Sequence, residues 1–212
     1  MKLVSKGAAQ FTLTFLPDEV RPHEGLYLPD VIDAIASRYH VVNKPEIAKL
    51  GNEGAKFQNA RYTSADRTIN ILEVSLFSDG LSATTTDTKD SELVLSDLFA
   101  WIKVEFGFRD PRISATPSYQ SDLVVSFDFE PGRTFERLSK FIFALNATSP
   151  VPMDLSGFAF ASDPATPAKA LFTLERRLNT PWSAGLYYSR ASMQTEAHIQ
   201  ALEELDRVFA AG

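Results

Sequence analysis

The sequence predicts an α+β protein built from tandem β-α-β(3-4)-α repeats, with helices packed on one face of an antiparallel sheet. Two observations lead to this prediction. The order strand, helix, hairpin, helix in residues 9–107 returns in residues 121–210, and a Gly-Leu pair lies at the matching place of each hairpin, at Gly80-Leu81 and Gly185-Leu186. Few residues are identical between the copies, so element order and turn position carry the inference.

Each copy opens on a strand with a period-two pattern. Large apolar residues recur at every second position, which places them on one face of a half-buried strand. These residues are Phe11, Leu13 and Phe15 in the first copy, and Leu123, Val125, Phe127 and Phe129 in the second.

An amphipathic helix follows each opening strand. Pro29 suits the first turn of one helix, and Thr134 is a candidate N-cap of the other. The stripes expected to be buried are Val31, Ile32, Ile35 and Tyr39 in the first helix, and Phe135, Leu138, Phe141, Ile142 and Leu145 in the second.

The hairpins and closing helices complete each copy. The first hairpin is expected at 69–78 and 81–86, around an Asp79-Gly80 turn. The second is expected at 170–178 and 185–190, with a longer turn that contains Pro181. Helices at 90–106 and 195–209 then close the two copies.

The domain organisation expected from the repeat is a first lobe at 1–108, a short linker at 109–120 and a second lobe at 121–212. Pro111, Pro117 and several small polar residues mark the linker. Because the linker is short, we expect the lobes to pack as one pseudo-symmetric unit.

This tandem order resembles the arrangement of the TATA-binding-protein-like fold group, which also includes the helix-grip ligand binders. The resemblance is one of topology and carries no residue motif. It implies a fold, whereas function has to be argued from a site.

Composition narrows the classes of function. The chain has 212 residues, with 21 Lys and Arg against 27 Asp and Glu, so the net charge is −6, which argues against nucleic acid as a partner. Cysteine does not occur, which excludes disulfides and thiolate metal sites. No secretory signal or run of 18 apolar residues is visible, so we expect a cytoplasmic protein with no membrane partner.

No local motif for catalysis, a cofactor or a metal is found. The run Gly51–Lys56 lacks the spacing of a phosphate-binding loop. His23, His40 and His198 are scattered, so we expect surface or capping roles for them rather than metal ligation. The third-ranked hypothesis is an enzyme whose site is assembled from distant carboxylates and histidines. We expect that the protein is not an enzyme and that it binds no cofactor.

The candidate interaction site is the second hairpin, where arginine and large aromatic residues gather. Such residues are enriched at interaction hot spots. The competing interpretation is a cross-strand ladder of ion pairs on a solvated face. The candidates are Trp182, Glu175, Arg177, Tyr187, Tyr188 and Arg190.

We therefore expect a non-enzymatic protein-interaction module of the inhibitor, immunity, adaptor or mobile-element accessory type. Its partner is an unidentified protein or a second copy that joins an unpaired strand edge. The alternative is a small-molecule binder with an apolar cavity between sheet and helices, lined by Phe11, Phe127, Phe129 and Phe141.

Overall fold

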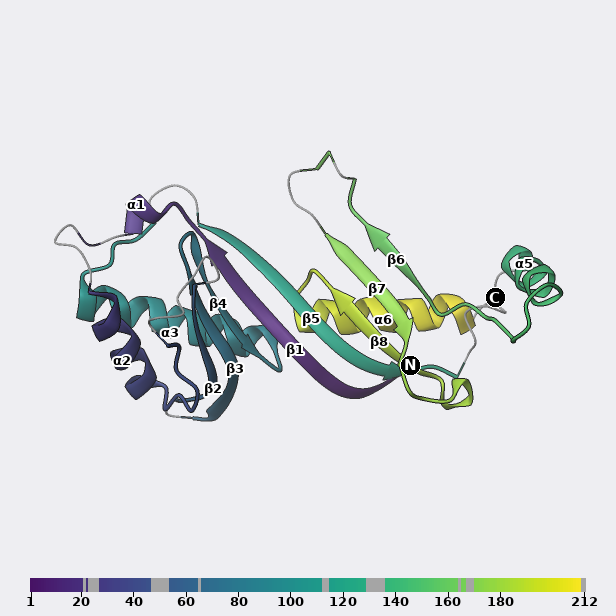
Figure 1. Ribbon diagram of the computed structural model, residues 1–212, viewed down its shortest axis with the longest axis horizontal. Helices are drawn as coiled ribbons and strands as arrows, with labels where there is room; N and C mark the ends of the chain where they lie inside the picture. The colour runs from purple at the N-terminus through teal and green to yellow at the C-terminus, as the bar shows by residue number, and fades with distance from the viewer. Residues whose placement is uncertain are drawn as a thin grey trace. The chain divides into compact units, whose positions relative to one another are not determined.

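The protein is α+β (Figure 1). The computed structural model describes residues 1–20, 22, 27–46, 54–64, 66–111, 115–128, 136–163, 165–166 and 170–210. Eight strands of this part of the chain form an open antiparallel sheet in the order β2-β3-β4-β1-β5-β8-β7-β6. Several predicted features lie outside these ranges, namely His23, residues 51–53, Phe129, Thr134 and Phe135.

The chain divides into two compact units. Ala8–Gln120 forms one, called here the N-terminal unit, and Met1–Gly7 with Ser121–Gly212 forms the other, called the C-terminal unit. Strand β1 (Lys2–Thr14) therefore contributes residues to both. Strand β5 (Thr116–Ser126) begins inside the expected linker, so the last residues of that segment are strand.

The sheet of the N-terminal unit runs β2 (Ala55–Thr63), β3 (Thr68–Phe77), β4 (Gly80–Thr85) and β1. Phe77 pairs with Gly80, so the two-residue turn is Ser78-Asp79, one residue earlier than predicted. Gly80 is needed for close packing, because a Cβ there would approach the Leu13 carbonyl oxygen to 2.7 Å. The expected strand and turn are thus present with a shifted boundary.

Helices α2 (Leu28–Arg38) and α3 (Thr88–Phe106) cover this sheet, and α1 (Pro17–Val20) is a single turn. The Asp87 carboxylate caps α3 by accepting the Lys89 backbone N–H at 3.1 Å. The predicted stripe of the first helix is buried as expected. The core includes Phe11, Phe15, Val31, Ile32, Ile35, Tyr39, Phe57, Ile71, Val74, Val94, Leu95, Leu98 and Ile102.

The C-terminal unit has strands β5, β8 (Leu186–Ala191), β7 (Leu171–Arg176) and β6 (Gly157–Ala161), in that order. Helix α6 (Thr195–Ala210) contributes Leu202 to the core, and Ile199 and Leu205 pack against it. The other buried members of this core are Leu123, Val125, Phe127, Leu174 and Tyr187.

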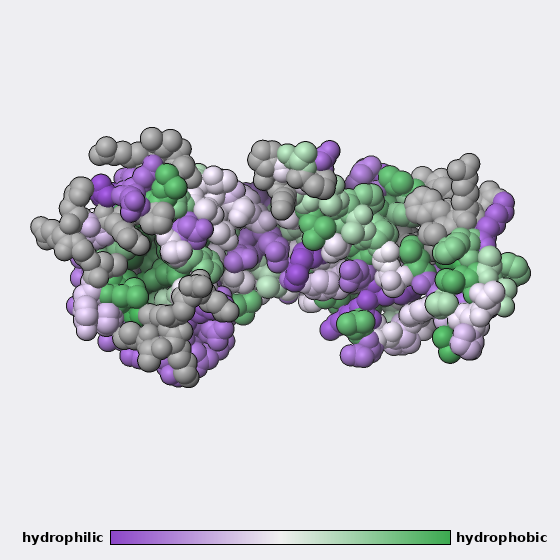
Figure 2. Space-filling view, turned by 45° about the horizontal axis from the view of Figure 1, so that its top comes forward, coloured by the Kyte–Doolittle hydropathy of each residue, from purple (hydrophilic) through white to green (hydrophobic). Residues whose placement is uncertain are grey.

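Helix α5 (Glu136–Asn146) departs from the prediction. Phe141 is 61% exposed and Phe143 is 79% exposed, and none of residues 139–146 belongs to the buried cluster of this unit. The side chain of Leu138, another residue of the predicted stripe, lies outside the described part of the structure. The prediction that Phe141 is buried is therefore wrong. Hydrophobic periodicity identified an apolar side of the helix, but it could not determine whether a neighbour covers that side. Figure 2 shows hydrophobic surface at the right-hand end of the molecule.

Within the described ranges, no helix combines the length and apolar character that a bilayer crossing requires.

Candidate functional site

The candidate site is built around Arg176, the last residue of β7. Arg176 pairs with Tyr187 on β8, which places both side chains on the face of the sheet that carries the core. The Arg176 side chain is only 8% exposed. Its Nε donates to the Leu155 carbonyl oxygen at 3.2 Å, and Nη2 lies 3.4 Å from an Asp154 carboxylate oxygen. A buried cation is thereby held in a fixed orientation by hydrogen bonds and one opposite charge.

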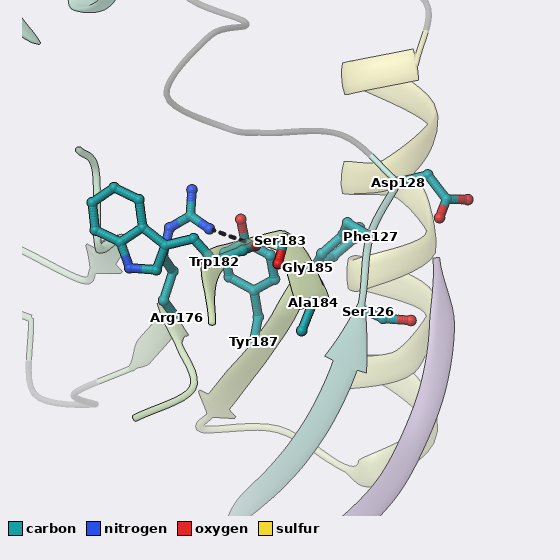
Figure 3. Close-up of a pocket in the computed structure, with 9 residues that line it drawn as sticks. All are labelled: Ser126, Phe127, Asp128, Arg176, Trp182, Ser183, Ala184, Gly185 and Tyr187. Atoms are coloured by element: carbon teal, nitrogen blue, oxygen red, sulfur yellow. Dashed lines mark hydrogen bonds between the residues drawn. The ribbon is translucent and has the colours of Figure 1, made fainter. Parts of the chain in front are cut away.

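Two aromatic rings flank the guanidinium of Arg176. The ring centre of Trp182 lies 4.9 Å from its central carbon, and the ring centre of Tyr187 lies 5.6 Å away. Both distances are within cation–π range. Arg176 Nη1 also donates to the Trp182 carbonyl oxygen at 3.5 Å, as Figure 3 shows. Trp182 is still 47% exposed, so an oriented indole is presented to solvent.

The turn that carries Trp182 is shaped by local sequence. A short 3-10 helix, Trp182–Ala184, follows Pro181 and ends at Gly185, whose φ is +57°. A Cβ at Gly185 would approach the Phe127 carbonyl oxygen to 2.6 Å, so glycine is required both by conformation and by space. This turn fixes the indole over Arg176.

A cavity of about 340 Å³ opens beside these residues. Its volume is within the range of small-ligand sites. The cavity is also large enough to hold one or two side chains of a partner protein. In Figure 3 the Asp128 carboxylate points away from Arg176, while the indole stands next to the guanidinium. The lining residues are Ser126, Phe127, Asp128, Arg176, Trp182, Ser183, Ala184, Gly185 and Tyr187.

Three of the predicted residues lie on the opposite face of the same sheet. Arg190 donates to both carboxylate oxygens of Asp122, at 2.9 and 3.0 Å, and to the Tyr188 hydroxyl at 2.9 Å. Glu175 is the cross-strand neighbour of Tyr188. Burial, and next the Asp122 carboxylate, raise the pKa of Tyr188, and the hydrogen bond with Asp122 raises the pKa of Arg190. A cross-strand ladder of polar pairs is the arrangement that the competing interpretation of this hairpin predicted for these residues.

The structure therefore separates the predicted cluster. Trp182 and Tyr187 line the cavity, whereas Glu175, Tyr188 and Arg190 do not. Arg177 follows the end of β7, and its backbone N–H bonds to the Leu186 carbonyl oxygen at 3.0 Å.

The residue that sequence reasoning missed is Arg176. The alternation of β7 placed it on a different face from its two charged neighbours, and only the register against β8 shows that this is the face of Tyr187. A register prediction for the hairpin would have been the available signal.

The prediction for His198 is wrong. It was expected at the surface or in a cap, but it is fully buried on α6. Its Nδ1 lies 2.8 Å from the Ser121 hydroxyl, and its Nε2 lies 2.8 Å from the Ser189 hydroxyl. Burial lowers the pKa of His198 to about 4, although nearby Asp122 acts in the opposite direction. A neutral imidazole that ties α6 to β5 and β8, without solvent access, is structural.

The residues of the alternative cavity lie in separate surroundings. Phe11 is in the core of the N-terminal unit, 5.0 Å from the Tyr119 ring centre. Phe127 is in the core of the C-terminal unit, 5.5 Å from the Tyr187 ring centre. A smaller cavity of about 230 Å³ does occur in the N-terminal unit, lined by Phe11, Leu13, Leu95, Ser96, Phe99, Ala100 and Lys103.

Among the residues placed by the structure, no three His, Asp or Glu side chains are grouped so that they could hold a metal ion.

No protein-family model and no curated protein matches this chain.

Proposed function

We propose that this chain is a non-enzymatic protein-interaction module that binds a partner protein through the Trp182 cavity. The observation that carries the proposal is the half-exposed indole of Trp182, held 4.9 Å from the buried guanidinium of Arg176. Tryptophan and arginine are enriched at binding hot spots. A side chain that is already oriented loses less conformational entropy when it binds.

The charges around the cavity favour a particular kind of partner group. Asp154 already offsets the charge of Arg176, and Asp128 lines the cavity, so a strongly anionic ligand gains little. Within the described residues, the hydrogen bonds of Arg176 use three of its five N–H donors. We therefore propose a partner side chain that covers the indole with apolar surface and offers a neutral hydrogen-bond acceptor, such as a tyrosine or glutamine.

Peptide display tests this function although the partner is unidentified. We expect a random peptide library to yield a consensus on the intact protein, with affinity reduced about 10-fold or more by Trp182→Ala. Leu178→Ala is the matched control, since Leu178 is 85% exposed and lies outside the cavity lining. Peptides that bind wild type and Trp182→Ala equally, or the lack of any consensus, would contradict the proposal.

We also propose that the two units are copies of one β-α-β3-α repeat. The supporting observation is the strand order, β2-β3-β4-β1 followed by β5-β8-β7-β6. If β1, β2, β3 and β4 correspond to β5, β6, β7 and β8, the order is the same when it is read from either edge of the sheet. Helices α2 and α3 then correspond to α5 and α6. This is the topology that the TATA-binding-protein-like resemblance implies. An experimental structure in which these elements fail to superpose would refute it.

A second candidate function is the binding of a small apolar molecule in the 230 Å³ cavity. Lining residues such as Phe11, Leu13 and Phe99 favour it, and Lys103 adds one charged group. Native mass spectrometry of gently purified protein would then show a reproducible added mass. We expect Leu95→Trp, which fills the cavity, to remove that mass, and a bare chain in both proteins would exclude this candidate.

A further inference from the structure

Strand β6 ends the sheet of the C-terminal unit. It pairs with β7 on one side, and no residue in the described ranges pairs with its other side. The strand reads Gly-Phe-Ala-Phe-Ala, without a charged residue or a proline. Natural edge strands usually carry such residues because they prevent pairing with other chains. An uncharged edge of this kind is therefore available for strand addition.

The hydrogen-bond pattern shows which residues of β6 face outward. Just before the strand, Arg176 donates its backbone N–H to the Ser156 carbonyl oxygen, and just after it, Ser162 donates to the Ala170 carbonyl oxygen at 2.9 Å. Hydrogen-bonded pairs alternate in an antiparallel ladder. Even-numbered residues of β6 thus bond to β7, while the backbone groups of Gly157, Ala159 and Ala161 point outward.

The edge of the N-terminal unit is protected differently. Asn43 forms a bridge with Gln58 of β2, and the Val42 N–H donates to the Asn59 carbonyl oxygen at 3.1 Å. The chain after α2 thus covers part of β2. In the described part of the chain after α5, residues 147–156 form no such bridge with β6.

We propose that two copies of this protein associate through antiparallel pairing of β6 with β6 of the second copy, about a two-fold axis at Ala159. In this register Ala159 faces Ala159 of the second copy, and Gly157 faces its Ala161. All three residues have outward backbone groups, so each pair exchanges N–H···O=C bonds in both directions. No like charges meet, and the pairing does not depend on the Trp182 cavity.

The same register covers an exposed aromatic side chain. Phe160 is 61% exposed, with its ring centre 5.5 Å from that of Phe158. Across the two-fold axis, Phe160 lies opposite Phe158 of the second copy. This is a non-hydrogen-bonded pair, in which side chains approach closely and aromatic residues stabilise the sheet. The alternation of small and aromatic residues is therefore self-complementary.

Cysteine cross-linking tests both the association and its register, because the chain contains no cysteine of its own. In a hydrogen-bonded pair the two Cα atoms are about 5.5 Å apart, within disulfide range. We expect Ala159→Cys to form a disulfide-linked dimer under mild oxidation. Ala161→Cys is the control on the same face, and its two copies would lie about 13 Å apart, too far for a disulfide.

Lysine substitution tests the same register without covalent trapping. Pairing of two short strands buries little surface, so we expect the wild-type dimer to have a dissociation constant on the order of tens of micromolar. Ala159→Lys places like charges opposite each other and should raise that constant about 10-fold or more, whereas Ala161→Lys faces Gly157 and should change it much less. Sedimentation equilibrium of the full chain measures both.

Three outcomes would overturn the proposal. The first is that the wild-type protein is still a monomer at about 1 mM. The second is that the Ala159→Cys and Ala161→Cys variants cross-link equally. The third is that Ala159→Lys and Ala161→Lys change the dissociation constant of the dimer equally. If the protein is monomeric, an extended segment of another protein, and not a second copy, would be the partner that pairs with β6.

Discussion

Acidification from pH 6.5 to pH 4 is expected to lower the free energy of unfolding by about 3 kcal/mol through His198 alone. Burial lowers the pKa of this residue from 6.5 to about 4. Between these values the unfolded chain binds a proton that the folded protein does not bind, so stability falls as pH falls. The lowering of the His198 pKa from 6.5 to about 4 corresponds to about 3 kcal/mol of stability. Well above pH 6.5 both states are neutral at this site and the effect vanishes.

Urea unfolding of His198→Gln isolates this contribution from that of the carboxylates. The variant should be less stable than wild type by about 1–2 kcal/mol at pH 7, because its amide reproduces only part of the bonding to Ser121 and Ser189. That difference should shrink or reverse by pH 4, since glutamine does not titrate. His40→Gln, at an exposed histidine, is the matched control and should keep the wild-type acid sensitivity. Parallel stability profiles for wild type and His198→Gln would refute the prediction.

Replacing Asp97 with alanine is expected to lower the free energy of unfolding by about 2–3 kcal/mol. The carboxylate accepts the hydroxyl of buried Tyr39 at 2.6 Å and two bonds from Arg38 Nη2, at 2.9 and 3.0 Å. Burial and this hydrogen bond raise the pKa of Tyr39, so the tyrosine stays a neutral donor. Without Asp97, a buried hydroxyl loses its acceptor and Arg38 loses its counter-charge.

A double-mutant cycle distinguishes this explanation from loss of packing. Because removing both partners of a buried hydrogen bond costs less than removing one, Tyr39→Phe should cost less in the Asp97→Ala background than in wild type. Asp33→Ala is the control, since the Asp33–Lys44 pair is well exposed and should contribute at most about 0.5 kcal/mol. Additive effects of Tyr39→Phe and Asp97→Ala would contradict the proposed network.

Local sequence patterns are sufficient to predict the α+β class and most of the helices and strands. The alternation around Phe11 and Leu123 correctly predicted strands with one buried face, and the stripe of the first amphipathic helix is buried as expected. Gly107, at φ +69°, ends α3 where predicted. These features depend on residues a few positions apart, whose periodicity and conformational preferences can be read directly from the chain.

Contacts between residues distant in sequence could not be predicted in this way, because they depend on the three-dimensional fold. The partnership of Arg176 with Trp182 and Tyr187 depends on the register between β7 and β8, where a shift of one residue would move every side chain to the other face. The burial of His198, the role of Asp97 and the exposure of Phe141 likewise depend on segments distant in sequence. Amphipathic patterns state which side of an element is apolar, whereas burial and ion pairing are set by the neighbours that the complete fold brings there.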